Sequence, residues 1–269
     1  MSQLPNPYFI GQFLISPHKN APKFSNPETA QKAFAEALHA IVNPDPSSYS
    51  PDIVETIRQL GYVSLWFFLS GILAPYGPYD KLLDPVSVSM CNFRQSDACI
   101  RPGAHAATFV PRGFFKSTII THGGVTWDLI RNPDERIVIV NAISEKAETF
   151  FHQVQANIIS NELVHLFYPE YVPGKKGKAT DKELILPNRS RSYPDPTLRP
   201  MGLTGAAEGG HYTLIMLDDL VGLDAIDQAR QSNATMETAK KWFRTNRRAL
   251  RVDEDSRVLL AATRYAMDD

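Results

Sequence analysis

The stretch Pro111-Arg112-Gly113-Phe114-Phe115-Lys116-Ser117-Thr118 indicates the fold class of this chain. An apolar run, His105 to Val110, comes directly before it, and a stretch of helical character, Ile119 to Ile130, comes directly after it. A strand, a tight loop with a Lys-Ser pair and a helix, in this order, are typical of a phosphate-binding loop, in which backbone N–H groups and the helix N-terminus attract phosphate. We therefore predict that all eight residues line a phosphate site.

The Lys-Ser pair carries the chemistry of such a loop. Lys116 would reach the β- and γ-phosphates, and the Ser117 hydroxyl would bind Mg²⁺. The usual spacing places glycines six and one residues before the lysine, whereas this chain has Val110 and Phe115 there. The motif alone leaves an ordinary strand-to-helix turn as an equal alternative.

A second signal lies about a hundred residues further along the chain. The apolar run Tyr212 to Leu217 ends in Asp218-Asp219. Such a run suits a parallel strand buried on both faces, and its carboxyl end is where α/β sheets bind ligands. Asp218 would hold Mg²⁺ and Asp219 would orient the attacking water. Two surface aspartates that start a turn are the alternative.

A third apolar run, Arg257 to Ala262, ends in Thr263-Arg264-Tyr265. A polar residue at the tip of this strand, Thr263, could sense whether a γ-phosphate has been cleaved. The alternative is simply the end of a core strand.

The remaining chain alternates expected strands and helices, which argues for βαβ units and a mostly parallel sheet flanked by helices. We expect a strand over 137–140, a helix over 145–160 with Ser144 as its N-cap, short strands at 183–186 and 197–203, and a long helix over 224–251. Residues 1–85 are expected to form a helical lead-in, with helices at 27–42 and 51–73, before an ATPase domain over 86–269.

The three motifs together resemble the ATPase domain of tailed-phage terminase large subunits, the motors that pump DNA into capsids. The resemblance covers roughly residues 105–269: the loop that starts with Arg112, the approach to Asp218-Asp219 through Gly210-His211-Tyr212, and Ala262-Thr263-Arg264-Tyr265 as the coupling motif. It departs from the family at Phe115, where glycine is usual, and at Asp219, where many members have glutamate.

The resemblance implies a P-loop NTPase fold of the ASCE or RecA-like type that binds ATP and Mg²⁺. It implies catalytic roles for Lys116, Arg112, Asp219 and Thr263, with Ser117 and Asp218 as metal ligands. The implied partners are double-stranded DNA, a portal protein, a small terminase subunit and further copies in a ring. Family members usually continue into a nuclease domain, which we expect to be absent here. The same resemblance implies that the protein is encoded by a virus and acts in the host cytoplasm.

Composition limits the class of protein to which the chain can belong. The 269 residues are 43% hydrophobic and 21% charged, with a net charge of −1, so any contact with DNA must come from local patches. Two cysteines, Cys91 and Cys99, are too few for a disulfide framework and are expected to be packing residues. The apolar stretch Val63 to Ala74 is too short to span a bilayer, and no secretory signal is visible.

Basic residues leave several assignments open. ATP cleavage in ring motors often needs an arginine from a neighbouring subunit. The candidates for it are Arg199, Arg244, Arg247, Arg248 and Arg251. Together with Lys240, the last four could also grip DNA or form a solvated helix face. Gln95 lies upstream of the loop, where a base-reading glutamine could sit. A helicase-like ATPase and a non-catalytic assembly module with a decayed phosphate loop remain alternative functions.

Overall fold

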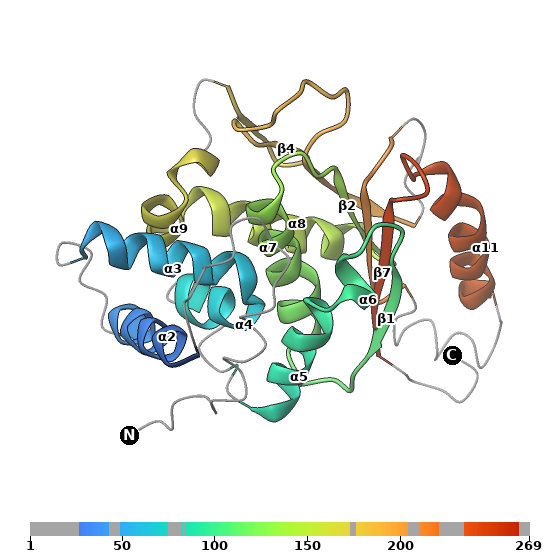
Figure 1. Cartoon of the computed structure of the whole chain (residues 1–269). Coiled ribbons are helices and arrows are strands. Elements are labelled where there is room, and N and C mark those ends of the chain that lie inside the picture. Colours follow the sequence, from blue (N-terminus) through green and yellow to red (C-terminus); the bar gives the residue numbers. More distant parts are fainter. Residues whose placement is uncertain are drawn as a thin grey trace.

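A seven-stranded sheet of order β1-β7-β6-β2-β5-β4-β3 lies at the centre of the part of the chain that the structure describes (Figure 1). The structure is a computed structural model, and it describes residues 27–42, 49–74, 82, 84–172, 176–203, 210–220 and 234–263. Five strands run parallel: β1 (His105–Phe109), β7 (Arg257–Ala262), β6 (Leu214–Asp218), β2 (Ile137–Asn141) and β5 (Leu198–Gly202). The short strands β4 (Leu184–Ile185) and β3 (Lys178–Ala179) add an antiparallel edge.

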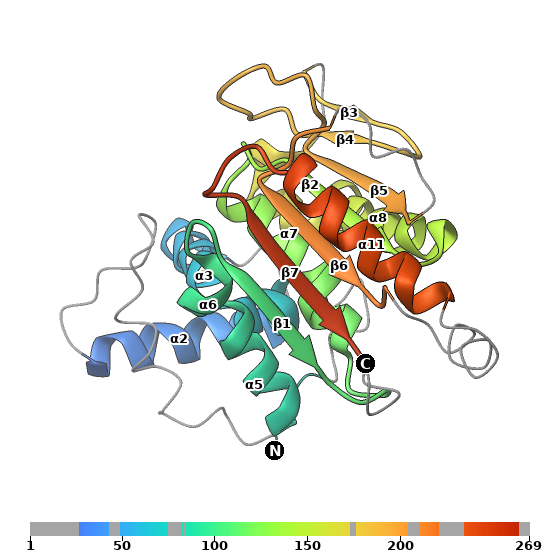
Figure 2. The same ribbon diagram turned by 90° about the vertical axis from the view of Figure 1, so that its right-hand side faces the viewer.

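Helices cover both faces of the sheet (Figure 2). One face is covered by α11 (Ala234–Ala249), and the other by α7 (Gly124–Arg131) and α8 (Ser144–Ile159). Alternate residues of each strand therefore enter different cores: Ile139 and Met216 join the larger core, and Val140 and Leu217 pack in the core under α11. This two-sided burial explains why β2 and β6 are continuous apolar runs rather than alternating ones.

The larger core extends into a helical layer formed mainly by residues before β1. Side chains of this layer, such as Leu60, Phe67 and Phe167, share one apolar cluster with the covered face of the sheet. Its elements are α2 (Pro27–Val42), α3 (Pro51–Val63), α4 (Leu65–Phe67), the π-helix η2 (Phe68–Leu73), α5 (Pro85–Arg94), α6 (Asp97–Ile100), α9 (Glu162–Phe167) and the short 3-10 helix η5 (Pro169–Tyr171).

The loop after β1 leads into a second π-helix, η4 (Ser117–Gly123), which continues as α7. A π-turn has a wider backbone spacing than an α-turn, and such turns often occur at functional sites. Gly124 sits at the junction, where an added Cβ would lie 2.7 Å from the Arg94 Nε. The absence of a side chain at Gly124 therefore makes room for a buried arginine beside the helix.

Arg94 belongs to a buried ionic network between the helical layer and the amino end of β7. Its guanidinium pairs with Asp128 and donates to the Ile120 carbonyl of η4 at 3.3 Å. Arg257 pairs with the same carboxylate at 3.3 Å and with Glu135 at 3.0 Å. Burial by itself raises the pKa of Asp128, but Arg257 and Arg94 outweigh that effect and leave the pKa lowered. The network thus ties the helix that follows the loop to β7.

The sequence analysis predicted this architecture correctly at the level of an α/β fold with a mostly parallel sheet flanked by helices. The helix at 27–42 and the strand at 257–262 are confirmed with the predicted bounds. Cys91 and Cys99 are buried and free, as expected of packing residues. Among the described residues, no helix is both long and apolar enough to cross a bilayer.

Some boundaries were wrong. Ser144 is the first residue of α8, and Ile143 is its N-cap. The Ile143 N–H donates to the side-chain oxygen of Asn141. The helix expected from Ile119 begins at Ser117 and starts as a π-helix, a geometry that apolar spacing does not reveal. Of the helix expected over 224–251, Ala234–Ala249 is helical, and residues 224–233 lie outside the described residues.

The substitution Asp128→Asn tests the ionic network. It leaves the buried Arg94 without its anion and leaves Arg257 paired with Glu135 alone, so we expect a loss of about 3–5 kcal/mol in the free energy of unfolding at pH 7. Because the pKa of Asp128 is lowered in the folded protein, its ionised carboxylate stabilises the fold fully above the ordinary carboxyl pKa of 3.8. This stabilisation is lost as the pH falls through the lowered pKa of the folded state. The difference between wild type and variant should therefore shrink below about pH 4.

Urea unfolding at pH 7 and at stepwise lower pH measures this difference. Asp181→Asn, at an exposed turn, serves as the control and should change stability by less than about 0.5 kcal/mol. A loss in Asp128→Asn that is small at pH 7, or that stays constant on acidification, would contradict the role given to the network.

Candidate functional site

The carboxyl ends of β1, β7, β6 and β2 meet at one edge of the sheet. In the register of the parallel strands, Phe109 lies opposite Ala262, and Asp218 lies between Ala261 and Asn141. The loop after β1 and the acidic pair after β6 are therefore separated by a single strand, β7. This edge is where open α/β sheets place their ligands.

Lys116 joins the loop to the acidic pair. Its Nζ lies 3.2 Å from Asp218 Oδ1 and 3.1 Å from Asp219 Oδ1. The Lys116 side chain is 7% exposed and that of Asp218 is 0% exposed, whereas Asp219 is 29% exposed. An amine and two carboxylates from segments a hundred residues apart thus form one cluster that faces solvent on the side of Asp219.

Asp218 is held from several directions. Its Oδ1 accepts from the Ser117 hydroxyl at 3.1 Å, and its Oδ2 accepts from the Thr121 hydroxyl. Its peptide carbonyl accepts from the Asn141 amide at 2.7 Å. Burial raises the pKa of Asp218, an effect that Lys116, Thr121 and Ser117 oppose but do not cancel. A buried carboxylate with a raised pKa gains from any further cation that approaches it.

Asp219 is fixed by β7. Its own N–H donates to the Ala261 carbonyl at 2.9 Å, and its Oδ1 accepts from the Thr263 N–H at 3.2 Å. The backbone of Asp219 is left-handed, with φ 42°, which is unusual for a residue other than glycine. Strain of this kind persists where surrounding contacts over-determine a conformation, and it is common at functional sites. Thr263 contacts the acidic pair through its backbone N–H.

The loop itself combines exposure with strained backbone. Residues 111–114 are exposed, Phe115 is half-buried against the larger core, and Lys116 is buried. Gly113 has φ 89° and an added Cβ there would meet nothing within 4 Å. Phe115 has φ 56°, so the residue that replaces the expected glycine adopts a conformation that glycine would adopt without strain. Val110 N–H donates to the Ala262 carbonyl at 3.2 Å and anchors the loop to β7.

The donors at this edge fit Mg²⁺ bound together with a phosphate. Ser117 and Asp218 offer the hard oxygen ligands that Mg²⁺ prefers, and this ion usually takes only one or two protein ligands beside phosphate oxygens and waters. A protein-only cage is a different kind of site, and the described residues contain no group of three His, Cys, Asp or Glu side chains that would form one. Ser117 and Asp218 could supply two of the oxygen ligands of such an ion and leave the others to phosphate and water.

The structure thus brings together five predicted site residues: Lys116, Ser117, Asp218, Asp219 and Thr263. Arg112 is exposed in the loop, and Thr118 is half-buried at the start of η4. Gln95 uses its side chain within the helical layer, where its Oε1 accepts from the Leu65 N–H at 2.8 Å and its amide donates to Asn92. This use does not favour a base-reading role.

The arginine candidates lie on three different segments. Arg199 is half-buried in the amino-terminal half of β5, away from the strand tips. Arg244 is exposed on α11, and Arg251 donates to the Asp253 carbonyl at 3.1 Å. Arg247 and Arg248 are in α11, but their side chains lie outside the described part.

Sequence reasoning missed Asn141 and Thr121. Asn141 had a usable signal, because it is the polar residue that ends the buried run 137–140 and so marks the carboxyl end of a parallel strand. Thr121 had none, because a threonine within an apolar helix is an ordinary core residue in sequence. Only the packing of η4 on β6 brings it to Asp218.

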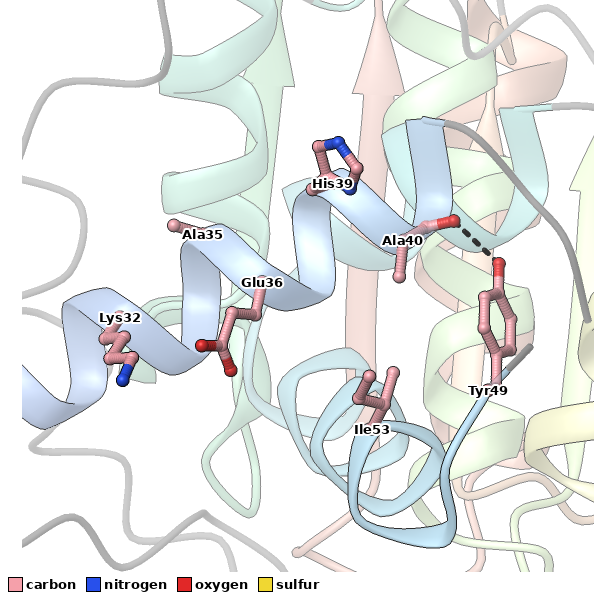
Figure 3. A pocket seen from close by; sticks show the side chains of 7 residues that line it. All are labelled: Lys32, Ala35, Glu36, His39, Ala40, Tyr49 and Ile53. Carbon is pink, nitrogen blue, oxygen red and sulfur yellow. Dashed lines mark hydrogen bonds between the residues drawn. The ribbon is translucent and has the colours of Figure 1, made fainter.

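A separate hollow of about 510 Å³ lies between α2 and α3 (Figure 3). It is lined by Lys32, Ala35, Glu36, His39, Ala40, Tyr49 and Ile53. The Tyr49 hydroxyl donates to the Ala40 carbonyl at 2.6 Å across it. These residues belong to the helical layer and not to the strand tips, so we assign the hollow no part in the site.

A pair of substitutions at Phe115 tests the loop geometry. Phe115→Gly and Phe115→Ala both remove the ring, but only glycine adopts a φ of 56° without strain. We expect the glycine variant to be more stable than the alanine variant by about 1 kcal/mol in urea unfolding. The same pair at Phe109, an exposed strand residue, should show the reverse order, because glycine weakens a strand. An alanine variant that is the more stable at both positions would contradict the left-handed loop.

No protein-family model matches the chain, and neither does any curated protein sequence. The geometry at the carboxyl edge of the sheet is therefore the basis for a functional assignment.

Proposed function

We propose that this protein is an Mg²⁺-dependent ATPase and, more specifically, the ATPase domain of a terminase-type motor that moves double-stranded DNA. The observation that carries the proposal is the contact of Lys116 with both Asp218 and Asp219 at the carboxyl edge of a parallel sheet. A loop lysine and a strand-end acidic pair are the two halves of a phosphoryl-transfer site, and they meet in the order and place that such a site requires.

Different residues of the site would bind the phosphates and the metal ion. Lys116 would turn from the carboxylates to the β- and γ-phosphates, whose oxygens accept charge-assisted hydrogen bonds from an ammonium group. Ser117 and Asp218 would hold Mg²⁺, which neutralises charge on the transferred phosphate when it is bound. The exposed Arg112 would add a second positive charge from within the loop.

Asp219 would orient the attacking water. It is the solvent-exposed member of the acidic pair, and its carboxylate is steadied by the Thr263 N–H. Once Lys116 moves to phosphate, Asp219 keeps this backbone contact and loses its charge partner. The position of Asp219 is then linked to the end of β7, which supports Thr263 as the residue that couples cleavage to movement.

Exposed basic groups on α11 support DNA as the partner. Lys240, Lys241 and Arg244 are exposed on the helix that covers the β6–β7 side of the sheet, next to the strands that carry the site. Such a row of cations suits contacts to phosphate oxygens, which position DNA without reading its sequence. The assembly into a ring with a portal protein and a small subunit is part of the same proposal and follows from the motif resemblance.

The first test is nucleotide binding and turnover in three variants. Lys116→Ala should weaken Mg²⁺-dependent binding of a fluorescent ATP analogue about tenfold or more, because a charge-assisted bond to phosphate is lost. Asp219→Asn should keep binding and lose roughly 10²–10⁴-fold in turnover, as expected for a residue that activates water. Lys240→Ala, which removes an exposed lysine paired with Glu237, is the matched control and should bind normally.

Equal binding in wild type and Lys116→Ala, or no binding in either, would contradict the ATPase and favour a non-catalytic module. Because an isolated subunit can lack a neighbour's arginine, binding carries more weight than turnover. Circular dichroism should confirm that each variant is folded.

The second test concerns DNA. We expect double-stranded DNA to stimulate ATP hydrolysis, and the combined change of Lys240, Lys241 and Arg244 to alanine to reduce that stimulation and its dependence on salt. The same variant should bind the fluorescent ATP analogue as the wild type does, since no described contact joins these three side chains to the site. Separation of DNA strands by the protein alone would indicate a helicase-like enzyme instead, and an ATPase indifferent to DNA would contradict the motor.

A further inference from the structure

The hydroxyl of Thr121 points in a different direction from the hydroxyls of three other helical threonines. Thr56, Thr126 and Thr149 each donate to the carbonyl four residues earlier in their own helix, at 2.7–2.8 Å. This back-bond is the usual way for a helical threonine to satisfy its hydroxyl. Thr121 instead donates across to Asp218 Oδ2, on a strand 97 residues later in the chain. Its side chain is fully buried, so this contact replaces the local one without help from solvent.

The partners of Asp218 fall into two groups. Oδ1 faces Lys116 and Ser117, the two residues that a bound nucleotide and Mg²⁺ would recruit. Oδ2 faces Thr121, which is enclosed by the core and has no access to a ligand. The carboxylate therefore has one oxygen on the exchangeable side and one on the permanent side. The Asn141 amide holds the peptide carbonyl of the same residue, so its backbone is fixed as well.

We infer that Thr121 is a positioning residue that holds Oδ2 of Asp218 and thereby keeps Oδ1 directed at the metal; this rests on the proposed function. A carboxylate free to rotate could turn either oxygen, or both, towards the ion. Mg²⁺ demands near-ideal octahedral geometry, so a carboxylate fixed with one oxygen forward suits it better than a mobile one. Hydrogen bonds that orient a metal ligand in this way commonly contribute tenfold to a hundredfold to metal affinity.

The hydroxyl reaches the carboxylate from a π-helical segment. In η4 the Gly124 N–H bonds to the Ile119 carbonyl five residues earlier, so this segment has a wider turn than an α-helix. Ser117 and Thr121 are four residues apart, a spacing that places two side chains on one face of a helix. Both face Asp218 and share its carboxylate, so η4 presents two hydroxyls to one buried acid.

The test compares three substitutions at Thr121 with one at Thr126. Thr121→Val and Thr121→Ala remove the hydroxyl, and Thr121→Ser keeps it. Thr126→Val removes an equally buried hydroxyl from the continuation of the same helix, away from the site. For each protein, the affinity for a fluorescent ATP analogue is measured in EDTA and across an Mg²⁺ titration, and thermal unfolding is recorded without ligand.

We expect Thr121→Val and Thr121→Ala to need roughly tenfold more Mg²⁺ for half-maximal enhancement of binding, with binding in EDTA unchanged because Lys116 is intact. Thr121→Ser and Thr126→Val should match the wild type in the Mg²⁺ titration, although Thr126→Val loses thermal stability. If Thr121→Val fails to fold, the comparison of Thr121→Ala with Thr121→Ser decides the matter.

An Mg²⁺ requirement in the hydroxyl-free variants equal to that of the wild type would overturn the inference and leave the ATPase proposal standing. A wild type that binds no nucleotide with or without Mg²⁺ would overturn both.

Discussion

The burial of one carboxylate, that of Asp218, is the constraint on which the site depends. A charged group without solvent costs several kcal/mol unless it is paired and hydrogen-bonded, so its surroundings must supply partners from every side. Here the partners of the carboxylate are Lys116 of the loop and Ser117 and Thr121 of η4. The Asn141 amide of β2 donates to the peptide carbonyl of the same residue. Each of these residues is held in place by the acid that it satisfies. The need to satisfy Asp218 therefore fixes the loop, η4 and the carboxyl ends of β6 and β2 relative to one another.

Strand β7 has a central part in this arrangement because it lies between the two halves of the site. Its carboxyl end accepts from Val110 of the loop and from Asp219 of the acidic pair, and donates to the Asp219 carboxylate through Thr263. Its amino end carries Arg257, which belongs to the buried network with Asp128 and Glu135. The helix that follows the loop is tied to the same network through Arg94. The loop is thus connected to the carboxyl end of β7, and the helix that follows the loop is connected to its amino end.

Left-handed backbone at Phe115 and Asp219 shows where the fold stores strain. Both residues flank Lys116 in space, one before it in the loop and one across the ion pair. Bulky or charged residues adopt this conformation at a cost of order 1–3 kcal/mol. Packing of the Phe115 ring against the core and the contacts of Asp219 with β7 offset that cost. Contacts with the core thus hold a residue other than glycine in a left-handed conformation at position 115.

The elements that depend on local pattern could be predicted from the amino-acid sequence. Apolar runs at 137–140, 214–217 and 257–262 predict parallel strands, because such strands are buried on both faces. A polar residue follows each run and marks the edge of the sheet where α/β folds bind their ligands. The strand order, which inserts β7 between the loop and the acidic pair, depends on tertiary contacts instead. So do the contact of Thr121 with Asp218 and the left-handed backbone at Phe115. These features arise from contacts between residues about a hundred positions apart, whose free energies no local pattern records.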